Sequence, residues 1–140
     1  MIFWDSSAVV PLLVNEPASD AAAAVMAADS DMIVWWATPI ECLSAIARRE
    51  ADGSLTPGDA DAARRGIDRL GETWNEVLGS DQVRERAGRL IRTHPLRAAD
   101  ALQLAAALTW ARGRPRAHLL TTLDARLAEA ARKEGFELAM

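Results

Sequence analysis

The chain has 140 residues, enough for one compact domain and too few for two, so we expect a single domain over residues 1–140. Half of the residues are apolar and 26% are charged, which is an ordinary mixture for a globular protein. The net charge of −4 argues only weakly against a nucleic-acid partner, because a metal-dependent nuclease keeps acidic residues in its site and can surround them with basic ones.

Neither a disulfide nor a membrane anchor is expected. The single cysteine, Cys42, cannot form an internal disulfide and lies in an apolar stretch, so it should be a small buried side chain. No apolar run approaches the roughly 20 residues that cross a bilayer. Asp5 stands where a signal peptide would continue its apolar run. We therefore expect a cytoplasmic protein with no membrane partner.

Short apolar runs alternate with longer helical patterns along the chain. Strands alternating with helices predict an α/β fold in which a central, mostly parallel sheet is flanked by helices on both faces. Ligands bind such sheets beyond the carboxyl ends of the strands, so polar residues at those ends are candidates for a functional site. In chain order, the expected elements are strand 2–4, helices 7–14 and 18–28, strand 32–36, helices 38–51 and 57–70, strand 73–78, helices 80–91 and 98–112, strand 118–121, helix 123–133 and strand 136–138.

Several helix boundaries carry recognisable end signals. Thr38 and Glu41 form a capping-box pattern around a proline, which predicts that Thr38 caps the helix beginning there. Ser80 is expected to cap the helix that reaches about Ile91. Gly113 and Pro115 should end the most apolar helix.

Two aspartates directly follow strand-like runs. Asp5 comes after the first strand, and Asp124 opens the helix that follows the strand at 118–121. Each also has a purely structural explanation. Asp5 could cap the next helix, and Asp124 could interact with a helix dipole, with Thr122 as the cap.

Glu41 and Asp100 lie near the starts of two other helices. The capping box would explain Glu41 without any function. Asp100 lies in a helix apolar enough to be mainly buried, where a carboxylate is costly unless something pairs with it. An ion pair with Arg97, one turn earlier, is the structural alternative. A metal site explains a carboxylate at this position better.

The four acids are more informative together than singly. Carboxylates gathered at one edge of a sheet repel one another unless they take up protons or bind cations. A set of oxygen ligands without cysteine or histidine selects Mg²⁺ or Mn²⁺ over zinc. We therefore predict one divalent-cation site made by Asp5, Glu41, Asp100 and Asp124. The two histidines are expected to be structural.

Four segments resemble the motifs of PIN-domain proteins, and more narrowly those of the VapC-type toxins of bacterial toxin–antitoxin pairs. They are IFWDSSAVV (2–10), TPIE (38–41), LRAADALQLA (96–105) and LLTTLDARL (119–127), and each contains one of the four acids. Each segment is weak evidence alone, but all four in this order form a specific signal over nearly the whole chain. Gln103 departs from the family pattern, since many relatives carry histidine there. The change could alter local packing or substrate contact, but it removes no acid.

The resemblance implies a parallel-sheet fold, dependence on Mg²⁺ or Mn²⁺, endonucleolytic cleavage of RNA and a homodimer. It also implies neutralisation by a small antitoxin protein whose tail fills the groove over the acids. Asp5, Asp100 and Asp124 would hold one or two cations, and Glu41 would act as a ligand or orient the attacking water.

Supporting roles are expected for residues beside the acids. Ser6, Ser7 or Thr122 could hydrogen-bond a ligand carboxylate or a water, although simple helix capping is an equal alternative for each. Arg97 and Arg126 could contact substrate phosphate or could form surface ion pairs.

Two further features concern partners and specificity. Adjacent strand residues face opposite ways, so one of Trp35 and Trp36 should join Trp4 in the core, and the other could cover a dimer or partner surface. Substrate specificity is expected to depend on the groove shape and on the loops around Gly53 and Gly113.

Three competing functions can be weighed against the same residues. A response-regulator receiver would want an acidic pair near the N-terminus and a lysine at a late strand end, but the only lysine, Lys133, falls in a terminal helix. A haloacid-dehalogenase-type phosphatase would want a second aspartate where Ser7 stands. The serious alternative is a non-catalytic PIN-like module that binds RNA or protein. The intact set of four acids argues against it.

Overall fold

Five parallel strands form one sheet in the order β3-β2-β1-β4-β5, in a computed structural model that describes all residues from 1 to 140. Every neighbouring pair of strands is parallel, so the expected mostly parallel sheet is parallel throughout. β1 lies at the centre, where both of its neighbours satisfy its backbone groups. The strands are β1 (Ile2–Trp4), β2 (Met32–Trp35), β3 (Asn75–Val77), β4 (Leu119–Thr121) and β5 (Glu137–Leu138).

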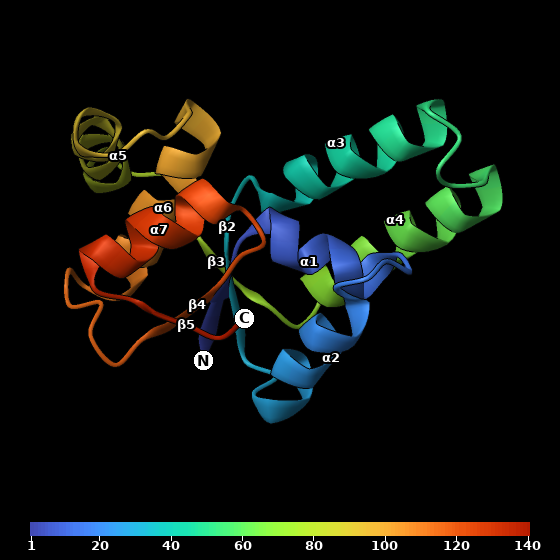
Figure 1. Cartoon of the computed structure of the whole chain (residues 1–140), viewed down its shortest axis with the longest axis horizontal. Helices are drawn as coiled ribbons and strands as arrows, with labels where there is room; N and C mark the ends of the chain where they lie inside the picture. The colour runs from blue at the N-terminus through green and yellow to red at the C-terminus, as the bar shows by residue number, and fades with distance from the viewer.

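Seven helices cover the two faces of the sheet, as the α/β pattern predicted (Figure 1). Helices α5, α6 and α7 lie on one side of the strands, and α1, α2 and α4 lie on the other, with α3 and α4 projecting as an antiparallel pair. All expected elements are confirmed, with no end displaced by more than two residues. The helices are α1 (Ser6–Leu13), α2 (Ser19–Ala28), α3 (Thr38–Ala51), α4 (Pro57–Gly71), α5 (Asp81–Thr93), α6 (Ala98–Trp110) and α7 (Ala125–Glu134).

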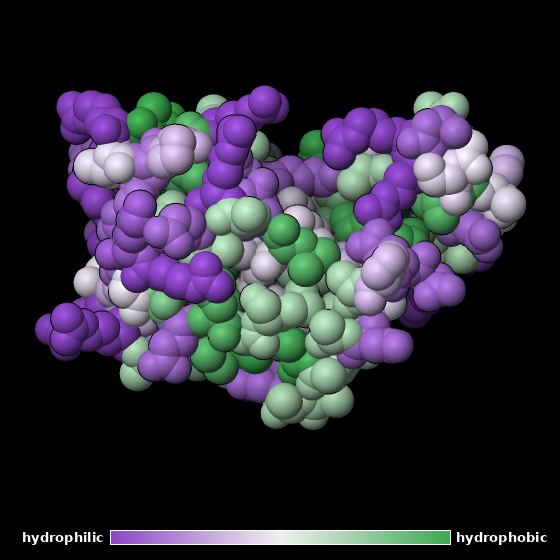
Figure 2. Space-filling view, in the orientation of Figure 1, coloured by the Kyte–Doolittle hydropathy of each residue, from purple (hydrophilic) through white to green (hydrophobic).

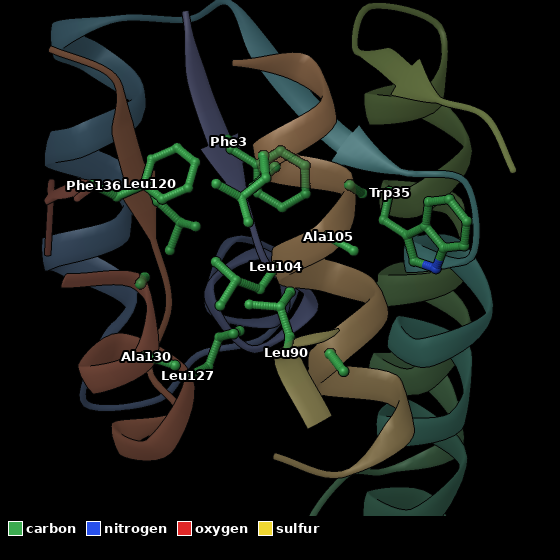
Figure 3. Packing of buried hydrophobic residues seen from close by; sticks show 14 of the residues in the cluster. Phe3, Trp35, Leu90, Leu104, Ala105, Leu120, Leu127, Ala130 and Phe136 are labelled. Carbon is green, nitrogen blue, oxygen red and sulfur yellow. The ribbon is translucent and has the colours of Figure 1, made fainter. Parts of the chain in front are cut away.

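The sheet separates two apolar clusters. Because strand side chains alternate between faces, Phe3 packs into the cluster under α5, α6 and α7, whereas Ile2 and Trp4 pack into the cluster under α1, α3 and α4. Figure 3 shows Phe3 and Leu120 from the strands meeting Leu104 of α6. Burial on both faces explains why the central strands are uniformly apolar.

The tryptophans follow the alternation expected of a strand. Trp4 is buried and Trp35 is nearly so, whereas Trp36 is 59% exposed. The expectation that one of the adjacent pair joins the core is confirmed. Cys42 is buried too, as expected for a small apolar side chain, and burial raises the pKa of its thiol to about 12.

Two expected caps are wrong. Thr38 does not cap α3: Ala37 occupies the cap position without a side-chain bond, and the Thr38 hydroxyl is buried and accepts a hydrogen bond from Gln103. Pro39 in the first turn of α3 has no backbone N–H, so one fewer donor needs an acceptor there, and the helix starts without the box. α7 is capped by Asp124 itself, and the Thr122 hydroxyl accepts the backbone N–H of Asp124 instead. The predicted Ser80 cap on α5 is confirmed.

No helix combines the length and the apolar character that crossing a bilayer requires.

Replacing Leu104 tests the apolar cluster under α6. Its side chain is fully buried, so Leu104→Ala should lower the free energy of unfolding by about 2–5 kcal/mol through lost burial and a residual cavity. Ile91→Ala, at a position 48% exposed, is the control and should change stability by no more than about 0.5 kcal/mol. Urea unfolding followed by circular dichroism measures both values. Equal effects would contradict this packing.

Candidate metal centre and nucleic-acid groove

Asp5 lies at the carboxyl end of the central strand and is only 3% exposed. Its N–H donates to the carbonyl of Thr121 at 3.0 Å, which ties the residue to the end of β4. Its Oδ2 accepts bonds from the backbone and hydroxyl of Ser7 and from the Thr122 hydroxyl, the last at 2.9 Å. Burial raises the pKa of Asp5 in spite of these donors. Asp5 therefore caps α1, and its other oxygen, Oδ1, has only a 3.5 Å contact with Ser6.

Glu41 lies in the first turn of α3, half-buried beside Asp5. Its Oε2 accepts a 2.7 Å bond from the Ser6 hydroxyl and a 3.2 Å bond from the Gln103 side-chain amide. Burial raises the pKa of Glu41, and the charges of Asp5 and Asp100 raise it further. The carboxylate therefore points to the neighbouring helices α1 and α6, and not back along α3 as a capping box would require.

Asp100 occupies the first turn of α6. The ion pair with Arg97, the structural alternative for this residue, does not form, since no basic side chain lies within 4.0 Å of this carboxylate. Burial raises the pKa of Asp100, with further contributions from the charges of Asp124 and Asp5. Asp100 is thus a carboxylate with acidic neighbours and no close cation in the protein.

Asp124 completes the set from the end of β4. Its Oδ1 accepts the backbone N–H groups of Arg126 at 2.8 Å and Leu127 at 2.9 Å, so it caps α7. Thr122 connects this cap to Asp5, because its hydroxyl donates to Asp5 and accepts from the N–H of Asp124. The structural and the functional explanations of Asp124 are therefore compatible, since capping uses only one of its two oxygens.

All four acids lie at helix N-termini that meet at one edge of the sheet. Asp5 and Asp124 cap α1 and α7, and Glu41 and Asp100 lie in the first turns of α3 and α6. The unpaired N–H groups and the dipole of each helix favour negative charge there. This edge can therefore hold several carboxylates close together, and it also suits a phosphate.

The four carboxylates are electrostatically coupled but do not form a tight ligand cage in this conformation. No three Asp, Glu, Cys or His side chains converge closely enough to hold a metal ion. Two of the acids bind donors through one oxygen only, which leaves Glu41 Oε1 and Asp124 Oδ2 free of hydrogen bonds. An oxygen-only set of carboxylates, three of them with raised pKa values, fits a hard divalent cation once the side chains rotate to meet it.

A groove passes over these acids. One cavity of about 690 Å³ runs from Glu41 and Asp124 to Arg48 and Arg49 of α3. A second, of about 570 Å³, contains Asp100, Arg97 and Arg126, and it shares Ala99 and Asp124 with the first. Figure 2 shows the hollow between the α5–α7 side and the projecting α3–α4 pair. The groove therefore places arginines on either side of the acidic centre.

Gln103 and Arg48 are part of this site but did not emerge from the strand-end argument. Gln103 is 1% exposed, follows Asp100 by three residues and so lies on the same face of α6. Arg48 follows Glu41 by seven residues, which is two turns along the same face of α3. The spacings of three and seven residues along the helices were the signal in the sequence that could have identified Gln103 and Arg48. The sequence identified Gln103 only as a departure from a family pattern, whereas in the structure its side-chain amide donates a hydrogen bond to Glu41.

Comparison with known proteins agrees with the fold. The model of the PIN domain matches residues 2–133. The chain belongs to the PIN-domain family. The protein named ribonuclease VapC45 of Mycobacterium tuberculosis is 33% identical to it over 109 residues, covering 77% of this chain and 75% of that protein. Ribonuclease VapC49 of the same species matches equally well.

Solved PIN-domain structures share this architecture at low identity. VapC20 of Mycobacterium tuberculosis, described as a toxin that cleaves the sarcin–ricin loop, has a TM-score of 0.71 at 18% identity, covering 98% of this chain and 97% of its own. FitAcB from Neisseria gonorrhoeae has a TM-score of 0.66 at 15% identity, covering 99% and 96%. VapBC-1 from Haemophilus influenzae has a TM-score of 0.63 at 16% identity, with the same coverage as FitAcB. At these identities the likeness establishes the fold alone.

Neutralising one acid tests the electrostatic coupling. Folding raises the pKa of Asp100, so the folded protein binds a proton at this carboxylate more readily than the unfolded chain does. As the pH rises through the pKa of the folded state, Asp100 becomes charged and its charge lowers the free energy of unfolding. Asp100→Asn in EDTA should therefore stabilise the protein at pH 7 by on the order of 1 kcal/mol. The gain should shrink as the pH falls, because wild-type Asp100 then takes up a proton itself and loses its charge.

Denaturant unfolding at several pH values measures this difference. Asp68→Asn on the exposed face of α4 is the matched control and should show no such pH-dependent gain. Loss of stability in Asp100→Asn at pH 7 would contradict repulsion among the acids.

Proposed function

We propose that the protein is a divalent-metal-dependent endoribonuclease, the toxin of a toxin–antitoxin pair, that hydrolyses RNA phosphodiester bonds in the groove over the four acids. The observation that carries the proposal is the gathering of four carboxylates at the carboxyl edge of the sheet, where burial raises the pKa values of Asp5, Glu41 and Asp100. Curated relatives named ribonucleases support the reaction class. A non-catalytic RNA- or protein-binding module would gain nothing from concentrating these charges.

Each acid has a role in this proposal. Asp5, Asp100 and Asp124 would hold Mg²⁺ or Mn²⁺, and Glu41 would be a further ligand or accept a hydrogen bond from the attacking water. A divalent cation bound there would lower the pKa of a bound water and would stabilise the negative charge on the attacked phosphate.

The neighbours of the acids position them and the substrate. Ser6 and Gln103 fix one oxygen of Glu41, so that the free Oε1 keeps a defined direction. Ser7 and Thr122 do the same for Asp5. Arg97 and Arg126 lie in the half of the groove that contains Asp100 and are free to bind phosphates of the RNA.

Protein partners are proposed from exposed apolar residues near the groove. Ile40 and Leu123 line it and are 67% and 43% exposed, which suits the apolar side chains of a small antitoxin segment. Structures of toxin–antitoxin complexes, one from Klebsiella pneumoniae, share the fold. Trp36 and Leu78, both exposed at the ends of β2 and β3, are candidates for the interface of a homodimer.

Metal binding should raise thermal stability. A cation that binds only the folded protein at 100 times its dissociation constant stabilises it by about 2.7 kcal/mol. MnCl₂ should therefore raise the melting temperature of the wild type by several degrees, whereas Asp100→Asn and Asp5→Asn should respond much less. Differential scanning fluorimetry in Mn²⁺, Mg²⁺ and EDTA measures the shift. A wild type that melts at the same temperature in all three would contradict the metal site.

Cleavage of RNA is the decisive test. Wild-type protein should cut one or more members of a panel of tRNA, ribosomal RNA and short single strands in Mg²⁺ or Mn²⁺, and EDTA should abolish cutting. Asp100→Asn should lower the rate at least 100-fold because a direct ligand is lost. Hydrolysis by a water leaves a 5′-phosphate and a 3′-hydroxyl, which end-labelling can identify.

Arg65→Ala, on the exposed face of α4 and outside the groove, is the matched control and should cut like the wild type. A 2′,3′-cyclic phosphate product would contradict the hydrolytic route. Equal cutting by wild type and Asp100→Asn would show that the activity does not come from these acids. A wild-type protein that neither binds Mn²⁺ nor cuts RNA would favour the non-catalytic module.

A further inference from the structure

A second basic cavity lies at the edge of the sheet opposite the acids. It has a volume of about 740 Å³, and its walls include Met1, Trp110, Arg112, Arg114 and His118. Met1 precedes β1 and His118 precedes β4, so the cavity lies at the amino ends of parallel strands, whereas the acids lie at the carboxyl ends. In Figure 1 this is the lower part of the molecule, near the N-terminus and the loop that joins α6 to β4, and the corresponding lower-left corner of Figure 2 is hydrophilic.

The cavity carries positive charge that the protein does not neutralise. Arg112 and Arg114 line the cavity, and Arg116 lies beside it in the same α6–β4 loop. All three are exposed and form no ion pair or side-chain hydrogen bond. No Asp or Glu occurs between Asp100 and Asp124. The ammonium group of Met1 is bound to Asp29 and adds no free charge. In a chain of net charge −4, three such neighbouring guanidinium groups form a local anion-binding surface.

Capping of α6 does not account for these arginines. The backbone N–H groups of Ala111, Arg112 and Gly113 already donate to the carbonyls of Ala107, Thr109 and Leu108, at 2.8–3.0 Å. The last turn is therefore satisfied by the backbone, and the guanidinium groups are not needed there as hydrogen-bond donors.

The loop is held in a strained shape. Arg112 and Ala117 adopt left-handed backbone conformations, with φ of 52° and 67°, which non-glycine residues rarely adopt. Pro115 packs against Gly135 at the end of α7, where a β-carbon would come within 3.2 Å of the proline ring. Backbone strain that surrounding contacts maintain is concentrated at functional sites. Here it fixes the directions in which the arginines leave the backbone.

An aromatic wall adjoins the positive charge. Trp110 and His118 meet edge to face, with ring centroids 4.9 Å apart, and both are only partly buried. Flat rings beside guanidinium groups suit an unpaired base next to a phosphate, because bases stack on aromatic faces while arginine binds phosphate oxygens.

We propose that this cavity is a second RNA-binding site, which holds phosphates and an unpaired base of the substrate at a distance from the bond that is cut. The proposal rests on the proposed function, because it assigns RNA as the ligand. The cavity would anchor a part of the RNA that the acidic groove does not touch.

The test is RNA binding by full-length protein carrying Asp100→Asn, in EDTA, so that no cleavage occurs. Fluorescence anisotropy with a fluorescein-labelled stem-loop RNA gives the dissociation constant at several salt concentrations. Adding Arg112→Ala, Arg114→Ala and Arg116→Ala together should weaken binding at least tenfold. It should also reduce the slope of log K against log salt by about 2, as expected for two or three lost phosphate contacts.

Two matched variants make the result specific. Arg65→Ala, Arg69→Ala and Arg92→Ala together remove the same charge from exposed, unpaired positions outside both cavities, and they should weaken binding less than threefold. Replacing the three loop arginines by lysine keeps the charge and should restore most of the salt slope. Thermal unfolding of each variant checks that the loop changes leave the protein folded.

Three outcomes would overturn the proposal. Equal weakening by the two alanine sets would mean that only net charge matters. Unchanged RNA binding by the loop variant would show that the cavity does not bind RNA and would leave a protein partner as the remaining occupant. The proposed function would still stand in that case if the wild type cuts RNA. A parent protein that binds no RNA would overturn this proposal, and the separate cleavage panel would then decide whether the proposed function fails with it.

Discussion

Repulsion among carboxylates at the carboxyl edge of the sheet is the constraint around which the rest of this site is arranged. Asp5 is almost completely buried, and its charge faces those of Glu41 and Asp100. The dipoles of four helix N-termini and the hydrogen bonds from the hydroxyls of Ser6, Ser7 and Thr122 offset part of this cost. Burial still raises the pKa values of Asp5, Glu41 and Asp100, and the neighbouring carboxylates raise those of Glu41 and Asp100 further. An arrangement that is costly to the fold is retained where a cation or a phosphate can use it.

The parallel sheet makes this arrangement possible with very short strands. Strands of two to four residues contribute few ladder bonds, yet they bring residues that are far apart in sequence, such as Asp5 and Thr122, to one edge. The apolar clusters on both faces then fix the helices whose first turns carry the remaining acids. Packing and electrostatics therefore act on the same elements: α6 supplies Leu104 to the core and Asp100 to the groove.

Periodicity and strand-to-helix order predicted the fold and the edge of the sheet at which the four acids lie, because apolar alternation and the order of elements are properties of the sequence itself. The Thr38–Glu41 capping box failed because the same residue types also make tertiary bonds, here to Gln103 and Ser6, that only the packed structure brings within reach. The role of Gln103 could not be predicted from its neighbours in sequence, since its partners lie 62 and 65 residues away. The free arginines of the α6–β4 loop were missed because ion pairing depends on the surrounding fold.

Helix α6 joins the acidic groove to the proposed second site and so constrains the RNA that both sites could hold together. Asp100 lies in its first turn, and the arginine-bearing loop begins one residue after its last. A helix of 13 residues is about 20 Å long and does not stretch, so it acts as a ruler between the acidic groove and the opposite edge. An RNA that occupies both ends must hold two groups of phosphates at that spacing around the body of the protein. A protein that recognises two groups of phosphates at a fixed spacing selects RNA by its folded shape more than by the order of its bases.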